Sequence, residues 1–297
     1  MKPLVGVDWG TSSLRVARVD ASGHAIEQRE FPRGILTVPA GGFPQVFGEA
    51  CGDWMKEPGA VALICGMAGS RQGWQEAPYA PCPAGHAEIA SQLAWIDRGR
   101  IAIVPGLSFD AGGAPDVMRG EETAVLGVMK LLGVSDARIV MPGTHCKWVR
   151  VRAGRIESFA TYMTGEFYAM LRQHSILART LPAQDGELYE DAFLRGVDYA
   201  MHAGNLLHAA FTARTLSLFE RLPQSAAPSY LSGLLIGEEL RSQDLHAGDT
   251  LVLAGADKLT QRYGLALSHL RAPFRVLGQE ATWLGLHAIA QSVKELA

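Results

Sequence analysis

The chain has 297 residues, of which 48% are hydrophobic and 19% are charged, and its formal net charge is −3 at pH 7. This length is natural for two domains, and the composition supplies a sizeable core and argues against disorder. The net negative charge argues against nucleic acid as a main partner, because a phosphate backbone needs a basic surface. No apolar run is long enough for a transmembrane helix, so we expect no membrane partner.

The cysteines and the N-terminus favour a cytoplasmic location. Four cysteines lie far apart without Cys-x-x-Cys spacing, which is typical of reduced thiols rather than of disulfides or zinc ligands. A predicted strand follows the N-terminus at once, so we expect no signal peptide.

The N-terminal stretch predicts two strands joined by a tight turn, at residues 4–9 and 14–19. Gly10 lets this turn wrap closely around a ligand, so that backbone N–H groups and the hydroxyls of Thr11 and Ser12 face an anion. Asp8, at the end of the apolar strand, can hold a hydrated cation such as Mg²⁺. The turn therefore suits a polyphosphate, although an ordinary hairpin is the alternative on this stretch alone. A second hairpin at 139–151, with Gly143-Thr144 at its turn, favours two similar lobes and one nucleotide.

Hydrophobic periodicity and turn residues predict the other elements in chain order. In the first half we expect a third strand at 24–31, a helix at 43–55, a strand at 61–65, a long loop at 66–85, a helix at 86–97, a strand at 101–104, a Gly-rich loop at 105–115 and a helix at 121–132. In the second half we expect a strand at 156–162, a helix after 163–168, helices over 187–241 broken near Gly204 and Pro223, strands at 250–253 and 274–277, and helices after Asp257 and at 280–296.

The loop at 66–85 is a candidate ligand-binding loop. Loops of this length that follow strands are usually functional or disordered, and the aromatic residues argue against disorder. Arg71, Gln72 and Trp74 are its candidate ligand residues, and the alternative is that Trp74 only covers the core.

Two adjacent acids, Glu121 and Glu122, open the helix at 121–132. Carboxylates in a first helical turn are stabilised by the helix macrodipole, which is a purely structural explanation for both. Their position after a Gly-rich loop and beside Arg119 is also suitable for a general base. Asp110 and Asp116 are the next candidates if neither glutamate acts.

Three segments in order resemble the two phosphate motifs and the adenosine motif of the actin/hexokinase/heat-shock-ATPase superfamily. They are Asp8-x-Gly10-Thr11-Ser12-x-x-Arg15, Gly143-Thr144 and Gly255-Ala256. Gly120-Glu121-Glu122-Thr123-Ala124 resembles the segment that carries the catalytic aspartate in carbohydrate kinases of this superfamily. The resemblance implies a two-lobed α/β fold with mixed sheets and with nucleotide in the cleft between the lobes. The lobes implied are 1–117 and 118–270, with 271–297 packing back toward the first.

Four further segments resemble 2-dehydro-3-deoxygalactonokinases: Gly66-Met67-Ala68-Gly69-Ser70-Arg71-Gln72-Gly73-Trp74, Met118-Arg119-Gly120-Glu121-Glu122-Thr123, Pro142-Gly143-Thr144-His145-Cys146-Lys147-Trp148 and Met163-Thr164-Gly165-Glu166. The resemblance implies that ATP and Mg²⁺ are used to phosphorylate the terminal (6-) hydroxyl of 2-dehydro-3-deoxy-D-galactonate, in galactonate catabolism. Alternatives are a kinase for another sugar or sugar acid and a non-catalytic nucleotide-dependent switch. Oligomeric state stays open.

The resemblance also implies a role for each site residue. Asp8 orders Mg²⁺, and Glu121 takes the proton from the acceptor hydroxyl. The expected nucleotide and phosphate residues are Gly10, Thr11, Ser12, Arg15, Gly143, Thr144, Lys147, Gly255 and Ala256. Lys147 either neutralises charge on the transferred group or is a solvated strand lysine. The expected substrate residues are Arg71, Gln72, Trp74, Arg119 and Tyr162. One of the two arginines should bind the substrate carboxylate in bidentate fashion, and the alternative is an ion pair of Arg71 with Glu76 or of Arg119 with Glu122.

Overall fold

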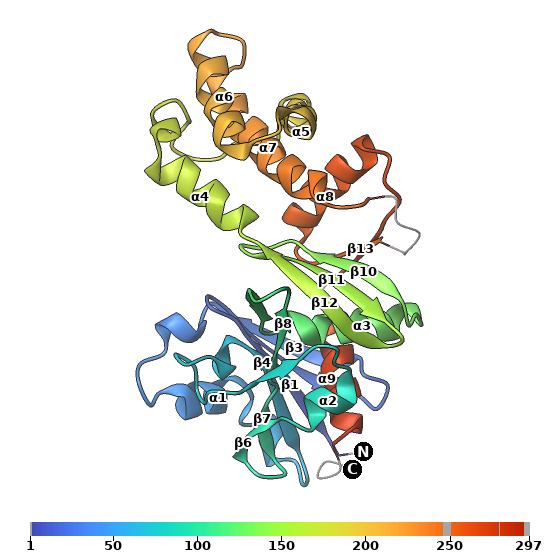
Figure 1. Cartoon of the computed structure of the whole chain (residues 1–297). Helices are drawn as coiled ribbons and strands as arrows, with labels where there is room; N and C mark the ends of the chain where they lie inside the picture. Colours follow the sequence, from blue (N-terminus) through green and yellow to red (C-terminus); the bar gives the residue numbers. More distant parts are fainter. Residues whose placement is uncertain (1, 246–250, 279, 294–297) are drawn as a thin grey trace. The chain divides into compact units, whose positions relative to one another are not determined.

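The computed structural model describes residues 2–245, 251–278 and 280–293, and the chain divides into two compact units (Figure 1). Unit 1 comprises Met1–Ile139, Val149–Ala160 and Leu277–Ala297, and unit 2 comprises Val140–Trp148 and Thr161–Val276. Each unit is described separately below. Among the described residues, no helix is both long and apolar enough to cross a membrane.

The main sheet of unit 1 has six strands in the order β3-β2-β1-β4-β7-β6. Its strands are β1 Leu4–Trp9, β2 Leu14–Val19, β3 Ala25–Phe31, β4 Val61–Gly66, β6 Ala94–Asp97 and β7 Ile101–Ile103. β1 pairs antiparallel with β2 and parallel with β4, and the register places Asp8 opposite Arg15. β1 and β4 are buried on both faces, so they carry nearly continuous apolar residues. The predicted hairpin and third strand are confirmed.

Two predictions in unit 1 are wrong. Only α2 His86–Ala90 is helical in the predicted helix at 86–97, because Ala94–Asp97 forms an edge strand that pairs antiparallel with β7. The predicted loop at 105–115 instead contains β8 Gly106–Asp110, which pairs antiparallel with β9 Pro115–Met118 and parallel with β5 Tyr79–Pro81. In both cases the segment is a strand because it hydrogen-bonds to a partner strand, which lies across a turn or farther away in the sequence.

The long helices of unit 1 are α1 Phe43–Cys51, α3 Glu121–Leu132 and α9 Ala281–Gln291. α3 and α9 pack through two glycines: a Cβ on Gly127 would lie 1.7 Å from the Ala281 carbonyl oxygen, and one on Gly285 would lie 1.8 Å from that of Thr123. Only glycine allows this separation, and it fixes the start of α3 against the C-terminal helix. Of the predicted helix at 280–296, residues 294–296 lie outside the described residues.

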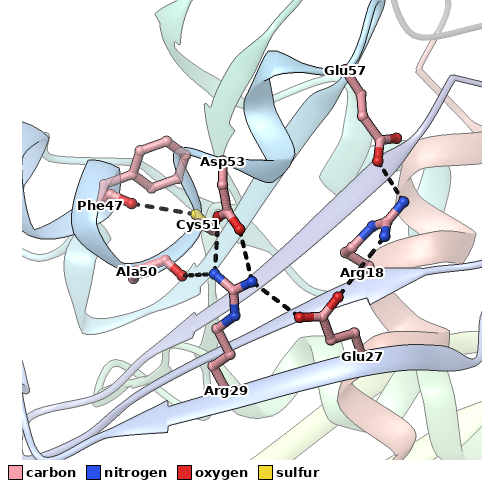
Figure 2. A network of polar contacts seen from close by, with 8 residues as sticks. All are labelled: Arg18, Glu27, Arg29, Phe47, Ala50, Cys51, Asp53 and Glu57. Atoms are coloured by element: carbon pink, nitrogen blue, oxygen red, sulfur yellow. Dashed lines mark hydrogen bonds and ion pairs between the residues drawn. The ribbon is translucent and has the colours of Figure 1, made fainter.

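A polar network holds the edge of this sheet to α1 and to the 3₁₀ turn Trp54–Lys56 that follows it (Figure 2). Arg29 on β3 donates two hydrogen bonds to Asp53, of 2.9 and 2.8 Å, and a third of 3.1 Å to the carbonyl oxygen of Ala50. Arg29 also lies 4.0 Å from the centre of the Trp54 ring, and its hydrogen bond to Asp53 lowers the pKa of that carboxyl to about 2. Unit 1 also contains the 3₁₀ turns Ile35–Thr37 and Met67–Gly69, which lie outside this network.

A second sheet has five strands in the order β12-β11-β10-β13-β14. Its strands are β10 Ala137–Met141, β11 Cys146–Arg152, β12 Arg155–Tyr162, β13 Leu251–Ala254 and β14 Arg275–Leu277. The second predicted hairpin and the strand after it are therefore confirmed. The predicted strand at 250–253 is found from Leu251, and residue 250 lies outside the described residues.

The helices of unit 2 are α4 Thr164–His174, α5 Glu190–Ala203, α6 Leu206–Leu218, α7 Ala227–Arg241 and α8 Asp257–His269, with 3₁₀ turns at Ile176–Arg179 and Gln224–Ala226 (Figure 1). The breaks predicted near Gly204 and Pro223 are confirmed. α7 packs closely on α5, because a Cβ on Gly196 or Gly233 would lie 2.2 or 1.9 Å from a carbonyl oxygen of the other helix. α7 is buried along nearly its whole length, so a charged residue on it needs hydrogen-bond partners.

The predicted lobes do not coincide with these units, since α3 belongs to unit 1 by its contacts and the change of unit follows Ile139. The division of the chain into functional lobes at residues 117 and 270 stays a prediction.

Candidate active site

The first phosphate turn connects β1 to β2 and is closed by backbone bonds. The Gly10 N–H donates to the Ser13 carbonyl at 2.9 Å, and the Ile35 N–H donates to the Gly10 carbonyl at 3.0 Å. Thr11 and Ser12 are exposed at the tip of this turn, and the turn's backbone packs on Gly34, where a Cβ would lie 2.1 Å from the Thr11 carbonyl oxygen and 2.2 Å from the Ser12 nitrogen. The local geometry is compatible with the predicted phosphate role.

Asp8 lies at the end of β1 and is paired with Arg15. The guanidinium donates to Asp8 Oδ2 from Nε at 3.2 Å and also from Nη2, and it lies 5.7 Å from the centre of the Trp283 ring. Both charged side chains are about one-fifth exposed, at 23% for Asp8 and 22% for Arg15. Arg15 therefore contacts the predicted metal ligand directly, which sequence spacing did not indicate.

Two glycines bring the start of α3 next to the end of β1. Gly66, at the end of β4, has φ of +89°, and a Cβ there would lie 2.8 Å from the Trp9 carbonyl oxygen and 3.5 Å from Asp8 Oδ1. Gly120, which precedes α3, has φ of +104°, and its Cβ would lie 3.1 Å from the Gly66 Cα atom. The backbone at these positions leaves no room for a side chain. Unit 1 thus gathers Asp8 and the first turn of α3 around Gly66.

The two acids of α3 have different environments. Glu122 is completely buried, and its carboxyl accepts hydrogen bonds from the Gly120 N–H at 2.6 Å and the Thr123 hydroxyl at 3.0 Å. Burial, and then the charge of Glu121, raise the pKa of Glu122 to about 8. Glu121 is only half-buried, and its Oε2 accepts the Arg119 N–H at 3.0 Å. A carboxyl that is protonated at neutral pH cannot act as a base, so this difference favours Glu121 over Glu122.

The long loop after β4 is compact. Ala68 accepts the Trp74 N–H at 2.8 Å, and Gly69 accepts the Ala77 N–H at 2.9 Å. Trp74 packs at 6.3 Å from Trp9 and 5.4 Å from Phe47, measured between ring centres, and so covers the core of unit 1. Its substrate role stays a prediction, since packing explains its position.

The two candidate arginines, Arg71 in this loop and Arg119 after β9, also differ. The Arg71 side chain is 88% exposed, and its Nε donates to Glu76 Oε1 at 3.1 Å, which is the surface ion pair considered from the sequence; Gln72 beside it is also exposed. Arg119 is only 9% exposed, lies 4.3 Å from the centre of the Tyr79 ring and donates from Nη2 to the Ala77 carbonyl at 2.8 Å. The alternative considered from the sequence, an ion pair of Arg119 with Glu122, is not found, because the Glu122 carboxyl accepts hydrogen bonds from the Gly120 N–H and the Thr123 hydroxyl instead. The buried Arg119 side chain therefore supports the loop, whereas the Arg71 side chain is accessible to solvent.

The second phosphate turn lies in unit 2 and is held by the N-terminus of α4. Thr144 is exposed and Gly143 half-buried, and the Glu166 N–H donates to the Thr144 carbonyl at 3.0 Å. A Cβ on Gly165 would lie 2.6 Å from the Gly143 carbonyl oxygen, so only glycine permits this contact. His145 Nε2 and Glu166 Oε2 lie 2.5 Å apart beside the turn.

Lys147 follows this turn on β11, and Tyr162 ends β12 shortly before α4 begins. Lys147 is only 5% exposed and its Nζ donates to the Thr161 hydroxyl at 2.7 Å, so the alternative of a solvated strand lysine is wrong. The Tyr162 hydroxyl lies 3.0 Å from the Ser242 hydroxyl and accepts from Gln243 Nε2 at 2.6 Å. Their ligand roles stay predictions.

The predicted adenosine motif, Gly255-Ala256, follows β13. Gly255 packs on the second turn, where its Cβ would lie 3.4 Å from the Pro142 carbonyl oxygen, and Ala256 is exposed just before α8. The strand, small-residue turn and helix expected from the sequence are therefore present, and the small side chains leave the turn open to close approach.

Glu239 on α7 was missed from the sequence. It is 3% exposed and accepts hydrogen bonds from the side chains of Trp148, Thr164 and Tyr263. The available signal was an acid at a helical position between Ile236 and Leu240, both apolar. The described residues contain no cluster of three or more histidine, cysteine or acidic side chains that could hold a metal ion.

Comparison with known proteins decides the family. The model of the 2-keto-3-deoxy-galactonokinase family matches residues 8–289. The chain belongs to the 2-keto-3-deoxy-galactonokinase family. Within this family, a 2-dehydro-3-deoxygalactonokinase of Escherichia coli (strain K12) is 34% identical over 292 residues, covering 97% of this chain and 98% of that protein. A probable 2-dehydro-3-deoxygalactonokinase of Rhizobium meliloti (strain 1021) is 36% identical over 298 residues, covering 97% and 96%.

Solved structures agree with this family assignment. A Sinorhizobium meliloti protein assigned to the same kinase class has a TM-score of 0.89 and 34% identity, covering 97% of this chain and 98% of that one. Component A of the (R)-2-hydroxyglutaryl-CoA dehydratase of Acidaminococcus fermentans has a TM-score of 0.53 at 12% identity, covering 98% and 99%. The second likeness is one of fold alone, and it agrees with the α/β nucleotide-binding fold expected for this kinase family.

Proposed function

We propose that this chain transfers the γ-phosphoryl group of ATP to the terminal (6-) hydroxyl of 2-dehydro-3-deoxy-D-galactonate. The observation that carries the proposal is the match to the 2-keto-3-deoxy-galactonokinase family over residues 8–289. Relatives named for this activity align with nearly the whole chain and leave no large part of it unmatched. The four cysteine thiols are free, which supports the accompanying proposal of a cytoplasmic, reducing location.

In the proposed reaction the acceptor oxygen forms a bond to the γ-phosphorus while the bond to the β,γ-bridging oxygen breaks. Glu121 takes the hydroxyl proton, and the half-buried position of its carboxylate supports this role. Thr11, Ser12 and Thr144 bind phosphate oxygens through hydroxyls and neighbouring amides. Such positioning and charge neutralisation supply most of the catalysis in phosphoryl transfer, and a positioned base typically contributes about 10²–10⁴-fold.

Asp8 is the residue that would hold Mg²⁺. A single carboxylate fits this ion, because Mg²⁺ usually keeps several waters and takes its other ligands from the nucleotide phosphates. When bound, the ion neutralises charge on the phosphates. Arg15 fixes the direction of the Asp8 carboxylate through the paired hydrogen bonds at one carboxylate oxygen.

Arg71 is the residue that we propose binds the substrate carboxylate. Its ion pair with Glu76 is largely exposed, and such pairs contribute only about 0–1 kcal/mol, so a substrate carboxylate can replace Glu76 at little cost. Arg119 is a poorer candidate, because a Cβ on Gly69 would lie 2.8 Å from its Nη1 atom and the loop therefore covers that side of the guanidinium. Arg119 acts by supporting the loop that carries Arg71.

The activity is tested by measuring ADP release with a panel of 2-keto-3-deoxy sugar acids, aldonic acids and neutral sugars. We expect turnover with 2-dehydro-3-deoxygalactonate. Preference for another sugar acid would overturn the substrate, preference for a neutral sugar would overturn the substrate class, and no acceptor-dependent ADP release would favour a nucleotide-dependent switch.

The carboxylate assignment is tested with Arg71→Met and, as its matched control, Arg119→Met. Losing a charge-assisted contact should lower the kcat/KM of Arg71→Met by about 10- to 150-fold on the sugar acid and much less on its lactone. Arg119→Met should lower thermal stability and affect both acceptors equally. Equal losses on both acceptors in Arg71→Met would refute the assignment.

A further inference from the structure

Glu239 is a buried carboxylate that accepts hydrogen bonds from three separate elements of unit 2. Its Oε1 accepts the Trp148 indole N–H of β11 at 2.6 Å. Its Oε2 accepts the Tyr263 hydroxyl of α8 at 2.7 Å and the Thr164 hydroxyl at the first residue of α4. Its side chain is 3% exposed, so water contributes little to its solvation.

The three donors are suited to an ionised acceptor. An indole N–H can only donate, and an ionised carboxylate can only accept. Burial, followed by the charges of Cys146 and Glu239, raises the pKa of Tyr263, so its hydroxyl keeps the proton that it donates. Three donors on one buried carboxylate compensate much of the cost of removing its charge from water.

Each donor belongs to an element that also contacts a predicted nucleotide-binding turn. Thr164 begins α4, whose next two residues contact the second phosphate turn: Gly165 touches Gly143, and the Glu166 N–H bonds to the Thr144 carbonyl. Trp148 lies on the strand that leaves this turn. Tyr263 lies on α8, which begins directly after Gly255-Ala256. Glu239 is therefore the common anchor of the phosphate turn and the adenosine turn.

We propose that Glu239 is a positioning residue for ATP, which holds the Gly143-Thr144 turn and the start of α8 in register for the phosphates and the adenosine. This inference rests on the proposed function, because it takes both turns as nucleotide-binding. Glu239 does not touch the nucleotide. Its effect passes through Thr164 to the phosphate turn and through Tyr263 to α8.

The test compares two conservative variants with a control. Glu239→Gln keeps the shape of the side chain, but its amide oxygen must face the Trp148 N–H, so its NH₂ group faces the two hydroxyls and their bonds are reversed. Tyr263→Phe removes only one donor. The matched control is Glu238→Gln, the neighbouring acid, which forms an ion pair with Arg241 on the outer side of α7.

The readout is the Kd for ATP without sugar acid, measured by calorimetry below the melting temperature of each variant, together with kcat and both KM values. We expect Kd and KM for ATP to rise about tenfold in Glu239→Gln and severalfold in Tyr263→Phe, with kcat and the sugar-acid KM nearly unchanged. Glu238→Gln should match the wild type.

A variant with a lowered melting temperature but a wild-type Kd for ATP would show that Glu239 is only structural and would overturn the inference. Equal increases in both KM values would overturn it as well. Failure of the proposed function looks different: the wild type would bind ATP but phosphorylate no sugar acid, and the comparison of ATP affinities would still decide the role of Glu239.

Discussion

Replacing Glu122 by glutamine should make the stability of the protein less dependent on pH. The buried carboxyl keeps its proton up to a pH of about 8, whereas in the unfolded chain it loses the proton near its ordinary value of 4.5. Between these values the folded state binds more protons than the unfolded state, so the free energy of unfolding falls as the pH rises. At 1.36 kcal/mol per pH unit, the loss between pH 5 and pH 7.5 is at most about 3 kcal/mol. Glutamine cannot ionise, so the Glu122→Gln variant should not show this loss of stability.

The measurement is urea unfolding at both pH values, without ATP or Mg²⁺, for the wild type and Glu122→Gln. The variant should gain stability relative to the wild type as the pH rises. Glu49→Gln is the control: the hydrogen bond from Arg33 lowers the pKa of Glu49 below its ordinary value of 4.5, so the stabilising effect of this carboxylate is lost only as the pH falls below that value, and the variant should show the wild-type pH dependence between pH 5 and pH 7.5. The groups facing Glu122 are Glu121, Thr123, the Gly120 amide and, from β4, the thiol of Cys65, whose pKa is raised by burial and by the charges of Asp8 and Glu122. An unchanged pH dependence in Glu122→Gln would refute the assignment of a neutral, buried acid.

Three other outcomes are expected. Asp8→Asn should abolish Mg²⁺-dependent turnover with the fold intact by circular dichroism, and near-normal activity would show that Asp8 is not the metal ligand. Glu121→Gln should lower kcat by about 10²-fold or more and leave the Kd for ATP nearly unchanged, since a base acts in the transition state; a larger loss in Glu122→Gln would reverse the assignment. Gly285→Ala should lower the melting temperature sharply, because its Cβ would lie 1.8 Å from the Thr123 carbonyl oxygen. Gly48→Ala, at an exposed position of α1 with nothing within 4 Å of the new Cβ, should be neutral or stabilising by about 0.5–1 kcal/mol, and a similar loss in both variants would contradict the packing argument.

Local patterns predicted the elements whose structure depends on their own residues. The two hairpins have strands of strict apolar or alternating character around a Gly-Thr turn, and the helices of unit 2 end where Gly204 and Pro223 interrupt the periodicity. The edge strand at Ala94–Asp97 and the hairpin of β8 and β9 were missed for one reason. Their hydrogen-bond partners determine them, and a short apolar segment has no period of its own that separates strand from helix or loop.

The candidate site could be predicted by residue type but not by environment. Spacing in the sequence made Glu121 and Glu122 equal candidates for the base. Only burial separates them, because Glu121 is half-buried and Glu122 is completely buried. Arg71 and Arg119 were equivalent in the sequence, and the packing of the loop leaves one in solvent and covers the other. Glu239 was missed because the residues that bond to it are distant in the chain, so no local pattern marks it.

Each unit brings a helix N-terminus against a neighbouring segment through a glycine. In unit 1 Gly120 precedes α3 and packs on Gly66 beside Asp8, and in unit 2 Gly165, the second residue of α4, packs on Gly143 of the predicted phosphate turn. A helix N-terminus carries a partial positive charge and unpaired N–H groups, which favour an anion within the first turn. A side chain at Gly165 would move α4 away from the second turn, and the effect of the helix N-terminus on an anion falls off within one turn. At Gly165 the glycine therefore matters for charge as well as for space, if the Gly143-Thr144 turn binds phosphate as predicted.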